Sequence, residues 1–140
     1  MIVGKWEFPE LMANEKMMWD RWDDKNKINR VQYLFIEDKA SGTPLQQTLA
    51  SEGINAIAWT PKDFDYPENK VARTKTLSWD VYRGFLYLPD MSDKTGEMSA
   101  YLVNEASLFA EDMSHSHDDS VDACSMAHSI WRYYGGGQDE

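Results

Sequence analysis

The sequence has little cysteine, no long apolar run and no recognisable targeting segment. Cys124 is the only cysteine in 140 residues, which excludes a disulfide framework and fits a reducing compartment. No apolar run approaches the roughly 20 residues that a membrane-spanning helix needs. Residues 1–10 carry charge early and lack the apolar stretch of a signal peptide. We therefore expect a soluble, intracellular chain with no membrane partner.

The rest of the composition is typical of a folded domain. Five Phe, seven Tyr and six Trp exclude a disordered or low-complexity chain. A chain of this length can bury roughly two-thirds of its surface on folding, enough for a core without disulfides. Because neither an internal repeat nor a long linker divides it, we expect one domain over residues 1–134. A glycine-rich, flexible tail is expected at 135–140.

The net charge of −10 is distributed unevenly. Residues 97–140 contain nine acidic side chains against Arg132 alone, so the first 96 residues are nearly balanced. A uniformly acidic protein would argue against a nucleic-acid partner. A protein whose acidic residues are confined to one region does not argue against it, because that region can bind cations while another face binds the phosphates of a nucleic acid. The alternative is that the acidic end is simply a solvated surface.

Hydrophobic periodicity predicts an α/β fold. The first half should contain a helix from Pro9 to about residue 22, a strand at 31–36, a short helix from Thr43 to Gly53, and a strand at 54–59. Strand, crossover helix and strand within about 30 residues form a βαβ unit, so the two strands should be parallel. The first strand is apolar enough to be covered on both faces.

The second half is expected to be mostly helical. It should contain a loop at 61–67, a helix at 68–79, an edge strand at 84–89, an exposed loop at 90–96, and helices at about 97–110 and 118–133. Pro89 is the reason for placing the strand at an edge.

Glu37 is the first candidate site residue. It directly follows the predicted strand at 31–36, at the carboxyl end where open α/β sheets place their ligands. Burying an acid there is costly unless it binds a cation or finds hydrogen-bond donors. The alternative is that Glu37 or Asp38 pairs with Lys39, or accepts backbone donors of the turn.

The second candidate is the acidic run at 117–122. On a helix, Asp118 and Asp122 are four residues apart and Asp119 and Asp122 three, so one face collects several carboxylates. A divalent cation would convert their mutual repulsion into attraction. The alternative is a capping box formed by Ser116 and Asp119, since acids in a first helical turn also favour the helix dipole.

Together the two candidates predict a carboxylate site for two Mg²⁺ or Mn²⁺ ions, of the kind that cleaves phosphodiesters. Hard cations prefer oxygen ligands, so a Cys/His cluster is not needed. A zinc site is an alternative, because His115, His117, Cys124 and His128 include a pair four residues apart, although a buried structural cysteine explains Cys124 as well.

Two basic residues and three tryptophans are weaker candidates for contact with nucleic acid. Lys70 and Arg73 are three residues apart on the predicted helix at 68–79, where they would either meet phosphate or form an exposed face. Trp6, Trp19 and Trp22 could stack on bases, but helical spacing favours a core position for Trp19 and Trp22.

Four motifs in order resemble the C-terminal nuclease domain of the large terminase subunit of tailed bacteriophages. They are Gly4-Lys5-Trp6-Glu7-Phe8-Pro9-Glu10-Leu11, Ile36-Glu37-Asp38-Lys39-Ala40-Ser41-Gly42, Lys70-Val71-Ala72-Arg73 and His117-Asp118-Asp119-Ser120-Val121-Asp122-Ala123. The resemblance covers nearly the whole chain.

The resemblance implies an RNase H-like mixed sheet flanked by helices, and a metal-dependent endonuclease that cuts concatemeric viral DNA during genome packaging. It implies that Glu37, Asp119 and Asp122 are catalytic. It also implies that Glu37, Asp118, Asp119 and Asp122 form the metal-binding group, and that Lys70 and Arg73 lie near the DNA backbone. The implied partners are double-stranded viral DNA, an ATPase motor domain, the small terminase subunit and the portal, in the cytoplasm of a bacterial host.

The sequence departs from the family pattern at its N-terminus. The family fold begins with a strand that carries a first catalytic Asp, and no strand before Glu37 supplies it here, so we expect an N-terminally truncated domain. The ATPase motif G-x-x-x-x-G-K-[ST] is also missing from the sequence. An alternative follows: a catalytically incomplete fragment that docks on a partner chain as a structural module.

Overall fold

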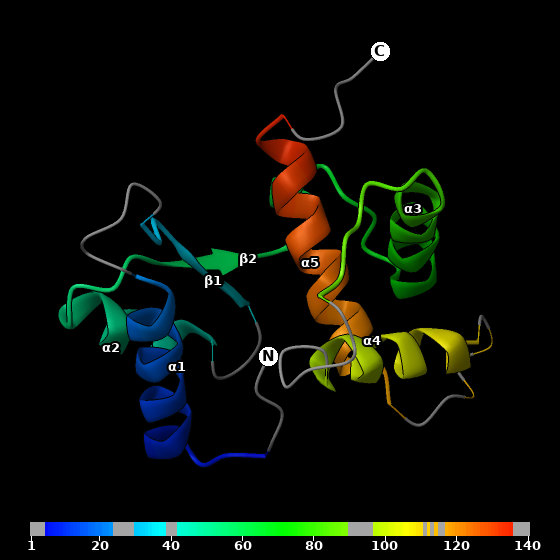
Figure 1. The fold of residues 1–140 in the computed structure, drawn as a ribbon. Coiled ribbons are helices and arrows are strands. Elements are labelled where there is room, and N and C mark those ends of the chain that lie inside the picture. The colour runs from blue at the N-terminus through cyan, green and yellow to red at the C-terminus, as the bar shows by residue number, and fades with distance from the viewer. Residues whose placement is uncertain are drawn as a thin grey trace. The chain divides into compact units, whose positions relative to one another are not determined.

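A computed structural model describes residues 5–23, 30–38, 42–89, 97–110, 112, 114 and 117–135. The chain divides into two compact units, residues 1–60 and residues 61–140, which we call the N-terminal unit and the C-terminal unit. Each is described by itself (Figure 1). The expected loop at 90–96 and all but the first residue of the expected tail at 135–140 lie outside the described residues.

The N-terminal unit is a βαβ unit preceded by a helix (Figure 1). Its two strands pair in parallel, with Glu37 opposite Trp59, which confirms the pairing predicted from the short crossover. Gly53 follows the crossover helix with a φ of 83°, a conformation that glycine adopts without steric cost. The elements are α1 (Phe8–Trp22), β1 (Leu34–Glu37), α2 (Gly42–Ser51) and β2 (Ala56–Trp59).

A single apolar core joins the elements of this unit. Leu49 of α2 is completely buried and packs in one cluster with Met12 of α1 and Ala56 of β2. Trp19 also packs against this core, as expected. The same expectation is wrong for Trp22, which is 61% exposed at the end of α1 with the Arg21 guanidinium 5.7 Å from its ring centroid.

The C-terminal unit is built around its last helix. Figure 1 shows α3 and α4 beside α5, and α5 also contacts the short helix η1. Asn69 caps α3, because its Oδ1 accepts a hydrogen bond from the Ala72 backbone at 3.1 Å. The elements are η1 (Pro61–Phe64), α3 (Lys70–Tyr82), α4 (Glu97–Leu108) and α5 (Asp119–Tyr133).

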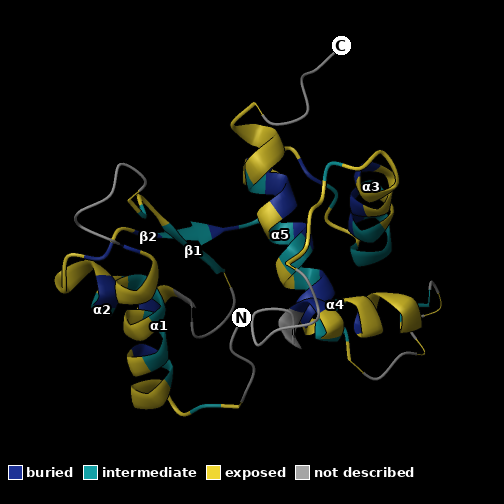
Figure 2. Ribbon diagram, in the orientation of Figure 1, coloured by how far each residue is buried: buried dark blue, intermediate teal, exposed yellow. Residues whose placement is uncertain are grey.

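Small side chains form the most buried stripe of α5. Val121, Ser125 and Ser129 follow one another at four-residue spacing and are almost fully buried, and Figure 2 shows the buried positions recurring along this helix. Residues at this spacing share one face of a helix. Their small volume lets neighbouring elements approach α5 closely.

Two sequence expectations about strands are wrong or only partly met. Residues 85–89 form no strand. Instead, the Phe85 backbone donates to the Asp80 carbonyl at 3.0 Å and the Phe85 ring lies 5.9 Å from that of Trp131, so this apolar run packs back onto the helices. β1 is half-buried along its length rather than covered on both faces.

The sheet in the described part of the chain consists of the parallel pair β1 and β2. The family resemblance implies a larger, mixed sheet. The described residues contain only these two parallel strands of it. The predicted loop at 61–67 includes the 3-10 turn η1. Within the described ranges, none of the helices combines the length and apolar character needed to cross a bilayer.

Candidate functional site

Three predicted site residues gather at the N-terminus of α5. Asp118 is the N-cap residue, and Asp119 and Asp122 lie in the first turn, where negative charge is favoured by the helix dipole. The capping box weighed from the sequence would place the N-cap at Ser116, which lies outside the described residues. The helix begins after Asp118, and the Asp118 side chain makes no capping hydrogen bond.

The first turn of α3 supplies cations to this acidic turn. The Lys70 ammonium lies 2.6 Å from Asp118 Oδ2 and 2.7 Å from Asp122 Oδ2. Arg73 donates to Asp122 Oδ1 at 3.1 Å and to the Glu68 carbonyl at 2.7 Å. We call Lys70, Arg73, Asp118 and Asp122 the Lys70 cluster. It brings together four residues that the sequence singled out from segments almost 50 positions apart.

The Lys70 cluster is partly shielded from water. The side chains of Lys70 and Arg73 are 24% and 10% exposed, so solvent screens these ion pairs less than it screens pairs at an open surface. Burial alone would lower the pKa of Lys70, but hydrogen bonds to Asp118 and Asp122 and their negative charge outweigh it, and the pKa is raised. Lys70 therefore carries its full charge at neutral pH.

This geometry changes the interpretation of the two basic residues. The sequence predicts that Lys70 and Arg73 either contact phosphate or form an exposed helix face. Arg73 is only 8% exposed, so the exposed-face alternative is wrong for it. Both residues are counter-ions of the predicted metal ligands. Their contact with DNA stays a prediction.

Asp119 and Glu37 lie outside the Lys70 cluster. Asp119 is exposed at the first helical position of α5. Glu37 is the last residue of β1 in the N-terminal unit rather than the residue after the strand, and the Asp38 backbone beside it donates to the Trp59 carbonyl at 2.9 Å. Lys39, the alternative partner of Glu37, is outside the described residues. Convergence of Glu37 with the aspartates of the C-terminal unit stays a prediction.

Glu105 is a residue near the acidic turn that sequence reasoning missed. It lies on α4, is only 3% exposed, and accepts a hydrogen bond from the Ser120 backbone at 2.8 Å and another from the Ser120 hydroxyl. A signal was present in the sequence. Glu105 is four residues from both Tyr101 and Phe109, so a carboxylate occupies the apolar stripe of an amphipathic helix, where it needs specific partners.

A second polar group lies deeper in the C-terminal unit. His128 is held by both ring nitrogens: Nε2 lies 2.8 Å from Asp80 Oδ2 and Nδ1 lies 2.7 Å from the Tyr66 hydroxyl. Arg132 also contacts Asp80, at 3.3 Å. Burial raises the pKa of Tyr66 to about 12, so its hydroxyl stays protonated. The group is a satisfied buried network that links α3 to α5.

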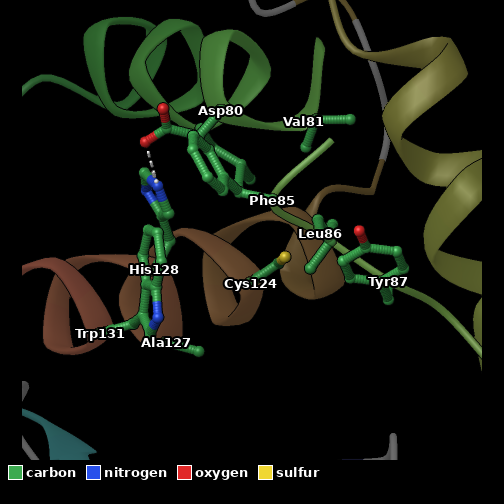
Figure 3. Close-up of a pocket in the computed structure, with 10 residues that line it drawn as sticks. Asp80, Val81, Phe85, Leu86, Tyr87, Cys124, Ala127, His128 and Trp131 are labelled. Carbon is green, nitrogen blue, oxygen red and sulfur yellow. Dashed lines mark hydrogen bonds and ion pairs between the residues drawn. The ribbon is translucent and has the colours of Figure 1, made fainter. Parts of the chain in front are cut away.

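This network borders a pocket of about 380 Å³ with mostly apolar walls. In Figure 3, Asp80 comes from α3, His128 and Cys124 from α5, and Leu86 and Tyr87 from the segment after α3. Both nitrogens of His128 are engaged, one by the Asp80 carboxylate and one by the Tyr66 hydroxyl. Burial also raises the pKa of the Cys124 thiol, which disfavours the thiolate.

The same contacts bear on the zinc alternative. His128 directs its two nitrogens to Asp80 and Tyr66, and the Cys124 thiol is held in its neutral form. His115 lies outside the described residues. In the part of the chain that the structure describes, no three His, Cys, Asp or Glu side chains are grouped as a metal site. The pair of Cys124 and His128 is better explained by packing.

The donor chemistry of the acidic turn nevertheless fits a hard divalent cation. Asp118 and Asp122 already converge on one positive charge, the Lys70 ammonium, and carboxylate oxygens are the ligands that Mg²⁺ and Mn²⁺ prefer. Buried Glu105 Oε1, which accepts no hydrogen bond from the described residues, adds negative potential nearby. Two converging carboxylates are fewer than a two-ion site requires.

Comparison with known proteins gives a family for this chain. A family model described as a terminase RNaseH-like domain matches residues 8–130. The match includes every predicted site residue. Neither the curated proteins nor the solved structures contain a significant match.

Proposed function

The chain belongs to the terminase RNaseH-like domain family, and from this membership and the acidic turn we propose that it is a metal-dependent DNA endonuclease. In this proposal it is the nuclease module of a phage terminase large subunit and cuts concatemeric viral DNA during packaging. The ligands of its two Mg²⁺ or Mn²⁺ ions are Glu37, Asp118, Asp119 and Asp122.

One observation in the C-terminal unit supports the metal site. Like-charged carboxylates four residues apart on a helix repel each other, yet Asp118 and Asp122 are oriented so that both contact one ammonium group. Two carboxylates that converge on one cation in this way support the proposal that the turn can hold a divalent ion. Glu37 is the proposed ligand from the N-terminal unit, because it ends a parallel strand at the edge where α/β sheets bind ligands.

Each residue has a distinct task in the proposed reaction. When bound, the two ions activate a water and offset the charge of the leaving oxygen. Asp118 and Asp122, which now share the Lys70 ammonium, would hold a divalent ion in its place, and exposed Asp119 and strand-end Glu37 would supply further oxygen ligands. Water attacks phosphorus as the bond from phosphorus to the leaving oxygen breaks, which leaves one phosphate terminus and one hydroxyl terminus.

The displaced Lys70 ammonium also has a role in this proposal. With a divalent ion on Asp118 and Asp122, the Lys70 ammonium would be released from both carboxylates and, on its long aliphatic stem, would be able to attract a phosphate of the DNA backbone. Arg73 is more firmly held, by the Glu68 carbonyl as well as by Asp122. We therefore assign the direct phosphate contact to Lys70 and the orientation of Asp122 to Arg73.

Nicking of supercoiled plasmid in the presence of Mn²⁺ or Mg²⁺ tests the activity. Glu37→Ala and Asp119→Ala should each abolish nicking, because each removes a proposed ligand. Asp20→Ala is the matched control: it removes an exposed carboxylate on α1 and should retain wild-type activity. Undiminished nicking by both site variants would exclude this assignment of the site, whatever the family.

A second candidate function is that of a structural module that docks on a partner chain. It is favoured by the small sheet: among the described residues β1 and β2 pair only with each other, and an isolated strand pair is marginally stable. On this hypothesis the lone chain should associate or melt without cooperativity. A cooperatively melting monomer in size-exclusion chromatography and calorimetry would argue against it.

The proposed partners and location follow from the nuclease assignment. They are double-stranded viral DNA, the ATPase motor domain, the small terminase subunit and the portal, in the cytoplasm of the bacterial host. In this proposal an ATPase domain moves DNA past the cutting site, so the nuclease acts while it is associated with that domain.

A further inference from the structure

We propose that Glu105 is a positioning residue that caps α5 from a neighbouring helix and thereby leaves the Asp118 carboxylate to bind a cation. This inference rests on the proposed function, since the cation is the one that the nuclease needs. Glu105 does not touch the ion or the DNA in this proposal. It acts through Ser120 and the turn that carries the aspartates.

The start of α5 lacks the usual local cap. The first backbone N–H groups of a helix have no intrahelical acceptor, and an Asp at the N-cap position normally supplies one from its own side chain. Asp118 occupies that position but makes no capping hydrogen bond. Its carboxylate contacts Lys70 at 2.6 Å instead. The helix start therefore needs an acceptor from elsewhere.

Glu105 is that acceptor. Its Oε2 receives hydrogen bonds from both the backbone N–H and the hydroxyl of Ser120, the second residue of α5. Glu105 and Ser120 are each only 3% exposed, so water cannot readily replace either bond. The contact fixes the first turn of α5 against α4, and the two neighbours of Ser120 in that turn are Asp119 and Val121.

The charge of Glu105 is well supported where it lies. Burial would raise its pKa, but the hydrogen bonds from the Ser120 backbone and hydroxyl outweigh that effect, and the pKa is lowered. Glu105 is therefore ionised at neutral pH. An ionised acceptor makes a stronger hydrogen bond to a backbone N–H than a neutral one does.

The arrangement divides two tasks between two acids. If Asp118 capped the helix itself, its oxygens would turn back toward the backbone of α5 and away from a cation. Because Glu105 satisfies the Ser120 N–H, Asp118 keeps the orientation in which it shares one cation with Asp122. A shorter side chain at position 105 should therefore both loosen the first turn of α5 and weaken cation binding.

Two variants separate reach from charge. Glu105→Asp keeps the charge but shortens the side chain by one methylene, so it should not reach Ser120. Glu105→Gln keeps the length and an acceptor oxygen but removes the charge. Asn104→Ala, an exposed change on the same helix, is the control. If the reach of the side chain to Ser120 is what matters, Glu105→Asp should weaken the helix start and cation binding, whereas Glu105→Gln should largely preserve both.

The first measurement is amide hydrogen exchange of the metal-free protein. The Ser120 amide has no acceptor within α5, so its protection reports the Glu105 contact directly. We expect exchange at Ser120 to become about tenfold faster in Glu105→Asp, the factor that corresponds to loss of one hydrogen bond to a charged acceptor. Glu105→Gln and Asn104→Ala should stay within about threefold of wild type.

The second measurement is Mn²⁺ binding by titration calorimetry. The dissociation constant should rise about tenfold in Glu105→Asp and much less in Glu105→Gln. Unchanged Ser120 exchange in Glu105→Asp, or equal damage in both variants, would overturn the positioning role while wild-type nicking left the nuclease assignment intact. Absence of Mn²⁺ binding and nicking in the wild type would instead overturn the proposed function, and this inference with it.

Discussion

Replacing Lys70 by Met probes the exchange between the lysine ammonium and a divalent ion. Met keeps an unbranched apolar stem of similar length but removes the positive charge that Asp118 and Asp122 share. In the absence of metal, those two carboxylates would then lose the cation that they share, while Arg73 would still contact Asp122. We expect Lys70→Met to destabilise the metal-free protein and to bind Mn²⁺ more tightly.

The magnitude follows from the burial of the pairs. Exposed ion pairs are worth about 0–1 kcal/mol, whereas breaking a buried pair costs about 3–5 kcal/mol because one charge is left unpaired. The Lys70 side chain is 24% exposed. Removing its charge should therefore lower the free energy of unfolding by an amount between these limits, about 2 kcal/mol. For a chain of this size that corresponds to a fall in Tm of about 4–8 °C.

The assay is thermal unfolding with and without millimolar Mn²⁺. Mn²⁺ stabilises the folded state according to its affinity, and Lys70→Met no longer has to release an ammonium group first. The gap in Tm between Lys70→Met and wild type should therefore narrow when Mn²⁺ is added. Lys62→Met, which removes an exposed charge of η1, should show neither effect. A gap that stays constant or widens with Mn²⁺ would refute the exchange.

Two further predictions concern stability. Leu49→Ala should destabilise the N-terminal unit by about 2–5 kcal/mol, because Leu49 is fully buried in its core; urea unfolding followed by tryptophan fluorescence measures this, and a loss below 1 kcal/mol would contradict the packing. Burial raises the pKa of Tyr66 to about 12. The protonated Tyr66 hydroxyl therefore makes its full contribution to the free energy of unfolding below pH 10, and this contribution is lost as the pH rises toward 12. Tyr66→Phe should therefore lose less stability over that interval than wild type does, and an unchanged alkaline profile would contradict this.

Local pattern was sufficient to predict most of the fold. The periodicity of 9–22, the Pro44 and Gly53 signals around the short helix, and the acidic start of the last helix all predicted elements that the structure contains. Parallel pairing followed from the length of the crossover. These features depend on neighbours in the sequence, which is why they can be inferred without knowledge of tertiary contacts.

Residues 84–89 were mispredicted because their outcome depends on tertiary contacts. An apolar run after a glycine is equally consistent with a strand and with a segment that packs on helices. The backbone contact of Phe85 with Asp80 and its ring contact with Trp131 decide the outcome. Neither partner can be identified from the run itself.

The acidic residues of the candidate site could be predicted from the sequence, but the residues that they contact could not. Asp118 and Asp122 could be identified from their spacing, whereas their pairing with Lys70 joins two helices far apart in the sequence. Glu105 was missed for a related reason. Its function depends on Ser120, 15 residues away, and only its place on the apolar stripe of α4 indicates that it is buried.

The central claim is that acids from the two units bind the same divalent ions. Anomalous diffraction from crystals grown with Mn²⁺ tests this directly, because it locates each ion relative to its ligands. We predict ions coordinated directly by Glu37 and by at least one of Asp118, Asp119 and Asp122. Ions held by one unit alone, with Glu37 outside coordination distance, would contradict the account.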